Sequence, residues 1–275
     1  MTELSVLIPS CDAYADIWQP FFALFHRHWP DCSYPVYLGS NHVACDQPNV
    51  ASLPIGEDRS WAESTRHMVE QIETPYILMM LDDFLLRRQV DGCCIARLLS
   101  DLDRLRGGYL RLKPFPPPDF KLARFPEIGE IEPNAPYRAA LQAAIWRKEV
   151  LLRLLQDGES AWEMEVYGSR RSDTLDCGFY CVWKPGLVYF AGVTRGKWTP
   201  KGVAVCREQG VPVDLAQRPM MAPRAALCLR LGWMRSAVLK LIPWKLRERL
   251  LFLFRSTGLR KPRPMPGRTT THEGE

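Results

Sequence analysis

The stretch that decides the fold is Thr74-Pro75-Tyr76-Ile77-Leu78-Met79-Met80-Leu81-Asp82-Asp83-Phe84. Six consecutive apolar residues follow Pro75, and a run of that length favours a strand buried on both faces over a helix. The strand leads directly into two adjacent carboxylates, Asp82 and Asp83. In an open α/β sheet, ligands bind beyond the carboxyl ends of the parallel strands, so this pair lies where a ligand is expected. An acidic turn without a ligand is the alternative, because aspartate is common in turns.

The segments before this strand predict an alternation of strands and helices. An aromatic-rich amphipathic segment stops at Pro30, and its rings recur at helical spacing, which favours a place in the core. Ser60 and Glu63 form a capping-box pattern at the start of a second helix. The expected elements are a strand at 4–10, a helix at 14–29, strands at 34–41 and 50–55, and a helix from 60 to 72. This order is typical of an α/β fold with a mostly parallel sheet flanked by helices.

The segments after the acidic pair are less regular. Residues 114–136 hold seven prolines, and we expect a long irregular loop there. Residues 137–156 resume as a strand or a helix, with Leu141, Ile145 and Trp146 at helical spacing. The remaining expected elements are a helix at 92–105 and strands at 109–112 and 187–190.

Composition and cysteine usage are those of an ordinary globular protein. The 275 residues contain no apolar run long enough to span a membrane, which takes about 18 residues. The N-terminus carries Glu3 and no cleavage-site pattern, so we expect no signal peptide. The nine cysteines are scattered, without paired C-x-x-C blocks. This usage predicts reduced thiols in the cytoplasm, and neither a disulfide framework nor a zinc site.

The net charge of +5 is unevenly distributed along the chain. Residues 221–275 carry 12 Lys and Arg against 3 Asp and Glu, whereas residues 1–220 carry the other 24 and 28. The body is therefore slightly acidic, which argues against nucleic-acid binding. Large apolar residues mix with basic ones between 223 and 255, a pattern that favours basic amphipathic helices at an anionic membrane surface. A helical pair packed on the body is the alternative, and we expect the last dozen residues to be disordered.

Five segments, taken in order, resemble a known class of enzymes. They are 6–12 (Val-Leu-Ile-Pro-Ser-Cys-Asp), 76–84, 137–146, 162–165 (Trp-Glu-Met-Glu) and 195–198 (Arg-Gly-Lys-Trp). Across roughly residues 4–200 the chain resembles the small bacterial GT-A-type glycosyltransferases of surface-polysaccharide (O-antigen or capsule) biosynthesis. The resemblance implies a GT-A-like α/β fold in which residues 1–110 bind a nucleotide-sugar donor and residues 111–220 bind the acceptor and supply a catalytic acid. Residues 221–275 are the basic tail.

The acidic pair departs from the family pattern in one respect. GT-A enzymes typically carry Asp-x-Asp after the central strand, whereas position 81 is leucine here. Asp83 stands where the last aspartate of that motif would, so the resemblance implies that Asp83 binds a divalent cation, Mg²⁺ or Mn²⁺. Asp82 would then contact the ribose or the sugar. Adjacent carboxylates repel each other, and a cation relieves that repulsion.

The resemblance also implies roles for residues outside the pair. Glycosyl transfer leaves negative charge on the nucleoside phosphate, and an inverting enzyme needs a carboxylate that takes the proton of the acceptor hydroxyl. Glu165 is the first candidate for this base and Glu163 the second, because the resemblance places an acid after the tryptophan; solvated loop acids are the alternative. The candidate donor-binding residues are Pro9, Ser10, Asp12, Asp82, Asp83, Arg195 and Lys197, and the candidate acceptor-binding residues are Arg111, Arg138, Gln142 and Trp162.

Some of these candidates have a plainer interpretation. Arg195 and Lys197 lie in a Gly-flanked loop and are suited to a diphosphate, but the same pattern fits an ordinary basic turn. For Arg111, Arg138 and Gln142 a role in packing is the alternative. The five histidines show no metal-ligand spacing.

Three functions are compatible with these features. The first is an inverting glycosyltransferase that moves a sugar from a nucleotide sugar to a glycan or lipid-linked glycan, in the cytoplasm at the inner face of the membrane. The second is a sugar nucleotidyltransferase, but those enzymes carry a Gly-rich basic loop after the first strand, which Pro9-Ser10-Cys11-Asp12 lacks. The third is a membrane-associated scaffold with a degenerate site, an alternative that Leu81 keeps open.

Overall fold

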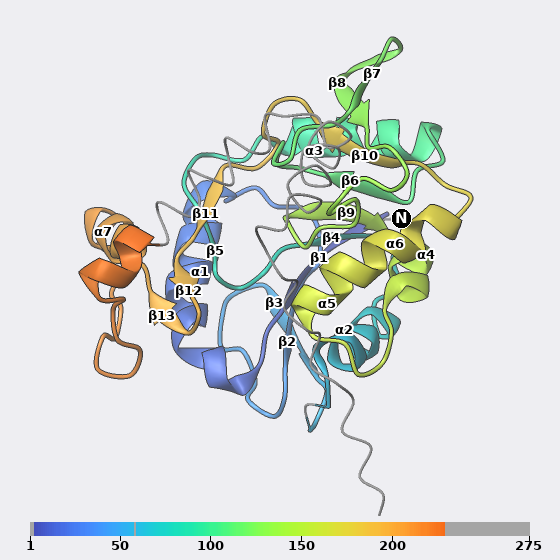
Figure 1. Ribbon diagram of the computed structural model, residues 1–275. Helices are drawn as coiled ribbons and strands as arrows, with labels where there is room; N and C mark the ends of the chain where they lie inside the picture. Colours follow the sequence, from blue (N-terminus) through green and yellow to red (C-terminus); the bar gives the residue numbers. More distant parts are fainter. Residues whose placement is uncertain (1–2, 58, 229–275) are drawn as a thin grey trace, which may run out of the picture. The chain divides into compact units, whose positions relative to one another are not determined.

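The computed structural model of the protein describes residues 3–57 and 59–228 (Figure 1). These residues belong to one compact unit that spans residues 1–232, and a second unit spans residues 233–275. The amphipathic helices and the disordered end expected toward the C-terminus lie, from residue 229 on, outside the described residues. None of the helices in the described ranges is long and apolar enough to cross a membrane.

A nine-stranded sheet organises the first unit, with the strand order β3-β2-β1-β4-β9-β6-β10-β8-β7 (Figure 1). Its strands are β1 (Leu4–Pro9), β2 (Val36–Ser40), β3 (Val50–Pro54), β4 (Tyr76–Met79), β6 (Tyr109–Arg111), β7 (Phe120–Leu122), β8 (Phe125–Glu130), β9 (Ala144–Arg147) and β10 (Phe179–Val182). The strands from β3 to β4 pair in parallel, as do β6 and β10. Within this sheet only β8 and β9 oppose the common direction, which confirms the predicted α/β fold with a mostly parallel sheet.

Helices cover both faces of the sheet (Figure 1). On one face, α1 (Ala15–His28) and α3 (Gly92–Arg104) share a hydrophobic core with side chains of β1 and β4 such as Val6 and Leu78. On the other face lie α2 (Trp61–Glu70) and α4 (Lys148–Leu154). Helix α2 approaches β2 so closely that a Cβ atom at Gly39 would collide with Met68. The central strands are therefore buried on both sides, as the unbroken apolar run of β4 predicts.

The sequence signals for the first helices are confirmed. The aromatic side chains of α1 are buried in the core, as expected; they are Trp18, Phe21, Phe22 and Phe25, with Trp29 just beyond the helix. Ser60 caps α2, because its hydroxyl accepts a hydrogen bond from Glu63 N at 3.2 Å. Asp91 caps α3 in the same way, with Cys94 N as the donor at 3.0 Å.

One expectation for the second half is wrong. Residues 114–136 do not form one irregular loop, because β7 and β8 pair antiparallel as a hairpin within them. Six of the seven prolines lie outside these strands, and Pro126 is not among the paired residues, so the prolines leave the ladder intact. The segment 137–156, expected as a strand or a helix, contains both: Ile145 and Trp146 lie in β9, and the helix begins at Lys148.

Shorter elements complete the unit. The late strand expected at 187–190 is β11 (Tyr189–Ala191), which pairs antiparallel with β5 (Phe84–Leu86) outside the central sheet. Because β5 directly follows the acidic pair and β11 pairs with β5, β11 lies close to the acidic pair. The remaining elements are η1 (Asp12–Tyr14), α5 (Ala161–Glu163), η2 (Met164–Gly168), α6 (Ser169–Arg171), η3 (Ser172–Thr174), β12 (Val193–Thr194), β13 (Lys197–Trp198) and α7 (Pro200–Glu208).

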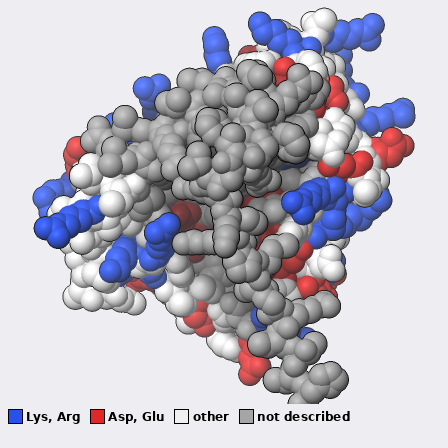
Figure 2. All heavy atoms as spheres, viewed as in Figure 1, with Lys and Arg blue, Asp and Glu red and all other residues white. Residues whose placement is uncertain are grey.

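Charges of both signs are interspersed on the face shown in Figure 2. Basic side chains project from the upper part of this view, where the β7–β8 hairpin lies and carries the exposed residues Lys121 and Arg124. Acidic side chains lie among the basic ones elsewhere on the face.

Candidate functional site

The acidic pair occupies a tight turn at the end of β4. The N–H of Phe84 donates a hydrogen bond to Leu81 O at 3.0 Å, so Asp82 and Asp83 are the two central residues of a β-turn. The turn lies at the edge of the sheet where the parallel strands end. This is the edge at which the sequence predicts a ligand.

Asp82 is buried and binds the loop that follows β1. The Ser10 hydroxyl donates a hydrogen bond to Asp82 Oδ2, and Trp18 Nε1 of α1 donates to Ser10 Oγ at 2.8 Å. Burial raises the pKa of Asp82 to about 7, although the Ser10 hydrogen bond and the charge of Arg218 act in the opposite direction. Ser10 and Asp82, both predicted to bind the donor, are thus in direct contact.

Asp83 is half-buried, and within the described part of the chain its buried Oδ1 atom has no hydrogen-bond partner. Burial, together with the neighbouring charge of Asp82, raises the pKa of Asp83 to about 7. Its backbone oxygen accepts a hydrogen bond from Gly192 N at 2.7 Å, which fixes the turn against the β5–β11 pair. A buried carboxylate oxygen without a partner costs free energy, and a bound ligand is one way to offset that cost.

The chemistry of the pair fits a hard divalent cation. Mg²⁺ keeps several waters or substrate phosphates as ligands, so one or two carboxylates from the protein suffice. Asp83 Oδ1 has no other partner among the described residues, and Asp82 lies beside it. In residues 3–57 and 59–228, no group of three or more His, Cys, Asp and Glu side chains is placed to hold a metal ion. Asp83 is therefore the candidate metal residue, and the substrate would supply further ligands.

A cavity of about 250 Å³ opens beside the pair. Its walls come from the loop after β1, from one side of α2 and from the acidic turn. The lining residues are Pro9, Ser10, Cys11, Tyr14, Trp61, Ser64, Thr65, Met68, Leu81, Asp82 and Asp83. Four of the predicted donor-binding residues, two from each strand end, therefore meet at one site.

Asp12 follows these cavity residues in the sequence and binds backbone groups. Its carboxylate accepts hydrogen bonds from the N–H groups of Asn41, His42 and Val43 at 3.0–3.2 Å. Its own N–H donates to Asn41 Oδ1 at 3.0 Å. These bonds join the loops that follow β1 and β2, so Asp12 shapes the edge of the sheet. A contact between Asp12 and the donor stays a prediction.

Arg195 and Lys197 lie at the tip of the β12–β13 hairpin and do not line the cavity. Arg195 has φ of 53° and Gly196 has φ of 71°, the conformation of a tight two-residue hairpin turn. The hairpin is linked to the cavity through Arg218. This side chain donates to Gly196 O at 3.2 Å, and its guanidinium lies 4.3 Å from the ring centroid of Tyr14.

Arg218 also forms a bidentate ion pair with Asp16 near the start of α1. The two hydrogen bonds measure 2.8 and 2.7 Å, and the side chains of Arg218 and Asp16 are 10% and 4% exposed. Arg218 Nη2 further donates to Ala13 O at 2.7 Å. A residue near the end of the described chain thus fixes η1 and with it Tyr14 in the cavity wall.

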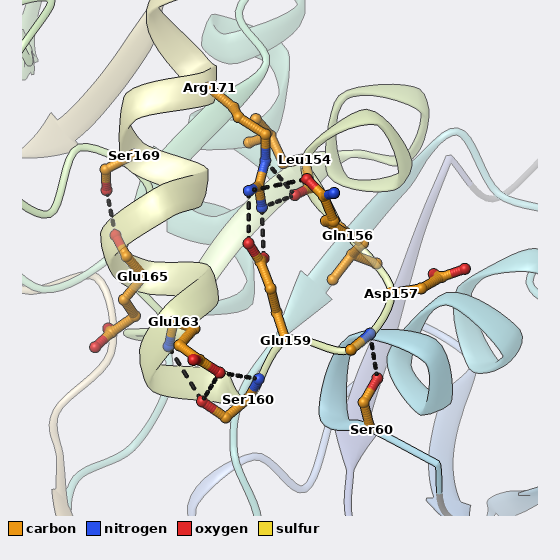
Figure 3. Close-up of polar contacts among 12 residues, drawn as sticks. Ser60, Leu154, Gln156, Asp157, Glu159, Ser160, Glu163, Glu165, Ser169 and Arg171 are labelled. Atoms are coloured by element: carbon orange, nitrogen blue, oxygen red, sulfur yellow. Dashed lines mark hydrogen bonds and ion pairs between the residues drawn. The ribbon is translucent and has the colours of Figure 1, made fainter. Parts of the chain in front are cut away.

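The acids around Trp162 have different partners (Figure 3). Glu159 forms a bidentate ion pair with Arg171, with both N–O distances at 2.6 Å. Glu163 completes a capping box, because its Oε2 accepts hydrogen bonds from Ser160 N at 2.9 Å and Ser160 Oγ at 2.7 Å. These hydrogen bonds lower the pKa of Glu163. Glu163, the second candidate base, therefore has a local structural function.

Glu165 instead reaches a different segment of the chain. Its carboxylate points away from the Ser160–Glu163 pair in Figure 3, and its Oε1 accepts a hydrogen bond from Leu141 N at 2.7 Å. Ser169, one turn later, accepts from Ala139 N at 3.0 Å and donates to Glu165 O at 2.5 Å. Glu165 belongs to η2, a π-helical turn of the kind that is frequent at functional sites. Residues 139–141 thus lie along η2.

Residues 141–143 also connect Glu165 to the acidic pair. The Tyr189 hydroxyl donates to Gln142 Oε1 at 2.6 Å and accepts a hydrogen bond from Ala143 N at 3.0 Å. The ring of Tyr189 stacks on Phe84, with the centroids 4.5 Å apart. Because Phe84 directly follows Asp83, contacts through Tyr189, Gln142 and Leu141 connect the acidic turn to Glu165.

The other predicted acceptor residues lie outside this group. Arg111 is buried, and its guanidinium donates to Tyr137 O at 3.0 Å and to Pro116 O at 2.8 Å. Arg138 is buried as well and donates to Ser172 O at 2.8 Å. Trp162 is 64% exposed. Both arginines therefore hold backbone in place, and contacts of these three residues with an acceptor stay predictions.

Several residues of the site carry no motif in the sequence. Tyr14 and Arg218 belong to the site only because distant segments meet, and their pairing spans 202 residues for Arg218 and Asp16. Tyr189 was predicted only as part of a strand. Lys113 is different, since it follows the buried strand β6 as Asp82 follows β4. Ligands bind beyond the carboxyl ends of parallel strands, and this rule, which pointed to the acidic pair, points to Lys113 as well.

No protein-family model matches the sequence, and no curated protein does either. Among solved structures, S. aureus TarS 1–349 in complex with UDP-GlcNAc is similar at a TM-score of 0.45 and 12% identity, over 76% of this chain and 65% of that chain. A second structure of S. aureus TarS 1–349 gives a TM-score of 0.42 and 12% identity, over 66% and 60% of the two chains. A cytidylyltransferase from Leptospira borgpetersenii gives 0.38 and 13%, over 60% and 68%. The chain thus spans less than two thirds of the TarS fragments that it matches. Structural similarities at these TM-scores and identities support no conclusion about the activity of this chain.

Proposed function

We propose that the protein is a glycosyltransferase that moves a sugar from a nucleotide sugar to a glycan or lipid-linked glycan. One observation carries the proposal: the Oδ1 atom of Asp83, which has no hydrogen-bond partner among the described residues, lies at the carboxyl edge of the sheet, beside a cavity lined by four of the predicted donor residues. The sequence resemblance to GT-A-type enzymes covers the same segments. A second carboxylate, Glu165, reaches Leu141 from another element.

In this proposal the cavity beside the acidic turn binds the donor. Asp83 holds a divalent cation, which when bound offsets the charge on the leaving nucleoside diphosphate. Asp82, held by Ser10, contacts the ribose or the sugar. Tyr14 and Trp61 line the same cavity and offer aromatic surface to a nucleotide base. Arg195 and Lys197 contact the diphosphate from the β12–β13 hairpin.

Glu165 is the proposed base for the acceptor hydroxyl. The hydrogen bond from Leu141 N fixes the orientation of its carboxylate, as a general base requires. Glu163, which closes a capping box, is already accounted for by helix capping. Gln142, bonded to Tyr189 and next to Leu141, the partner of Glu165, contacts the sugar or the acceptor in this proposal.

The sugar nucleotidyltransferase alternative has less support. The loop after β1 contains no glycine and folds into η1, so it offers no flexible Gly-rich cradle for the phosphates of a nucleoside triphosphate. The scaffold alternative does not explain why Asp82 and Asp83 have raised pKa values. Burying two acids lowers the stability of the fold, and such groups occur more often at functional sites than in scaffolds.

A panel of nucleotide sugars, measured by thermal shift with and without Mn²⁺, tests the proposal. A ligand that binds only the native state raises the apparent Tm, so one donor should shift it, and more strongly with Mn²⁺. Release of the nucleoside diphosphate from that donor should then be followed in the wild type, in Asp83→Asn and in Asp82→Asn. We expect Asp83→Asn to abolish release and Asp82→Asn to weaken donor binding more moderately.

Three outcomes would contradict the proposal. The first is the absence of any donor that shifts Tm. The second is a wild-type rate of release by Asp83→Asn at saturating donor. The third is release of pyrophosphate from a nucleoside triphosphate and a sugar phosphate, which would favour the nucleotidyltransferase.

A further inference from the structure

Thr65 of α2 is a buried polar residue to which the proposed function assigns no role. The residue is 1% exposed, and its hydroxyl has no hydrogen-bond partner within residues 3–57 and 59–228. A threonine inside a helix can donate to the carbonyl oxygen three or four residues earlier, but in the described part of the chain Thr65 forms no such bond. A buried hydroxyl without a partner costs free energy, so the position of Thr65 calls for an explanation.

Thr65 shares this property with the acidic turn. Among the described residues, the buried side-chain oxygen atoms without a partner are Thr65 Oγ1 and Asp83 Oδ1, and the other atoms without a partner are ring nitrogens of histidine and tryptophan. Both oxygens belong to residues that line the cavity beside the acidic turn, whereas none of those histidines and tryptophans lines it. A ligand in this one cavity would therefore satisfy both oxygens.

The cavity wall around Thr65 suits a flat ring with a polar edge. Trp61, Thr65 and Met68 all line the cavity, and their spacing places them on one face of α2. Tyr14 lines the cavity from η1, so two aromatic side chains offer stacking surface. The Thr65 hydroxyl, one helical turn from Trp61, adds both a hydrogen-bond donor and an acceptor.

The size of the cavity limits which part of a nucleotide sugar it holds. Its volume of about 250 Å³ is below the roughly 300–1,000 Å³ of pockets that enclose a whole small-molecule ligand. In the proposed function the acidic turn contacts the cation and the ribose or the sugar. The aromatic and apolar wall formed by Tyr14, Trp61 and Met68 then remains for the base.

We propose that the Thr65 hydroxyl hydrogen-bonds the edge of the nucleotide base in this cavity and helps to select the base. The inference rests on the proposed glycosyltransferase function and adds to it a residue that recognises the donor. The hydroxyl donates to a carbonyl oxygen or ring nitrogen of the base, or accepts from its N–H group. A base without the matching group leaves the hydroxyl unpaired and binds more weakly.

Calorimetry of the full chain with UDP, CDP, ADP and GDP, in one buffer that contains Mn²⁺, tests the inference. The four nucleotides share the ribose and the diphosphate, so differences among their affinities report on the base. Thr65→Val keeps the shape of the side chain and removes the hydroxyl. We expect it to weaken binding of the preferred nucleotide about tenfold and to reduce the preference over the other three. Thr65→Ser keeps the hydroxyl and should bind within a few-fold of the wild type.

Thr74→Val is the matched control. Thr74 precedes β4 at the opposite edge of the sheet, and its hydroxyl lies within hydrogen-bonding distance of Ser5 Oγ at 2.9 Å and Tyr76 O at 3.0 Å. The control should therefore lower the Tm and leave nucleotide binding unchanged. Thr65→Val should do the reverse, because it breaks no hydrogen bond of the free protein and its Tm should not fall.

Three outcomes would overturn the inference. The first is binding of none of the four nucleotides, and the second is equal binding by the wild type and Thr65→Val. The third is a loss by the same factor for all four nucleotides, which would place the hydroxyl at the shared ribose or diphosphate.

The role of Thr65 and the glycosyltransferase function can fail separately. Base-selective binding that depends on Thr65, in a protein that transfers no sugar, would keep the base site and reject the proposed function. Sugar transfer with an unchanged donor KM in Thr65→Val would keep the function and reject the role of Thr65. If both hold, Thr65→Val should raise the donor KM about tenfold and leave kcat unchanged, because a contact with the base is the same in the ground state and the transition state.

Discussion

The ring of Tyr189 stacks on the ring of Phe84 with the centroids 4.5 Å apart, and this contact joins the two halves of the candidate site. Phe84 follows the acidic pair in the first half of the chain. Tyr189 lies in β11 and binds Gln142, whose neighbour Leu141 donates to Glu165. A rigid contact between large rings at this position holds the donor cavity and the candidate base in a fixed relation.

The first prediction concerns stability as a function of pH. Asp82 and Asp83 have pKa values raised to about 7, so between about pH 4 and pH 7 the folded chain binds more protons than the unfolded chain. The free energy of unfolding therefore falls as the pH rises through this window, and the loss persists at pH 8. Asp83→Asn removes one buried charge, and we expect its Tm at pH 8 to exceed that of the wild type by a few degrees, with little difference at pH 4.5.

Thermal melts in EDTA at both pH values check this expectation. Asp46→Asn is the control, because Asp46 is exposed and its removal should give no pH-dependent difference. Added Mn²⁺ should raise the Tm of the wild type and leave that of Asp83→Asn unchanged. A lower Tm for Asp83→Asn than for the wild type at pH 8 would show that the Asp83 charge supports the fold.

The second prediction separates the two candidate bases. Glutamine at position 165 can still accept the hydrogen bond from Leu141 N but cannot take a proton, so Glu165→Gln should lower kcat about 10²-fold or more. The donor KM should barely change, because the base meets the acceptor. Glu163→Gln is the matched control, since glutamine also serves in a capping box, and we expect its kcat to stay near that of the wild type. Steady-state kinetics on both variants measure these effects. A large loss of kcat in Glu163→Gln alone would identify Glu163, and not Glu165, as the base.

The third prediction concerns the buried ion pair that fixes η1. Arg218→Gln leaves the Asp16 carboxylate, which is 4% exposed, without its partner, and breaking such a pair costs about 3–5 kcal/mol of unfolding free energy. Arg97→Gln is the control, because its pair with Glu127 is more than half exposed on both sides and its loss should cost much less. Urea unfolding measures both. Equal losses in the two variants would show that the Arg218–Asp16 pair contributes no more than a surface contact.

The fourth prediction concerns the basic tail, which we propose binds an anionic membrane surface. The full chain should co-sediment with anionic vesicles at low salt and much less with neutral ones, because attraction to lipid charge is screened by ions. A chain that ends at Gly232, the boundary of the first compact unit, should stay folded and lose this binding. It should also keep its activity on a short water-soluble acceptor.

Melting curves on both chains distinguish membrane binding from packing of the tail on the body. If residues 233–275 cover apolar surface, their removal should lower Tm or solubility. Equal vesicle binding by the full chain and the chain ending at Gly232 would end the membrane hypothesis.

The sequence by itself determined the elements whose signals are local. The run from Tyr76 to Leu81 predicted the central strand and the acidic turn, and Ser60 with Glu63 predicted the start of α2, because burial pattern and capping act within a few residues. The same local rule failed for the β7–β8 hairpin. There the pairing between strands, and not the proline content, decides the structure.

The tertiary structure alone decided which candidate residues meet. Glu163 and Glu165 are two positions apart and face different sides of the helical segment, so Glu163 closes a local capping box whereas Glu165 reaches Leu141 of a distant segment. The Arg218–Asp16 pair brings together residues from distant segments. Contacts of this kind depend on how whole strands and helices pack against each other, and no local pattern of residues encodes that packing.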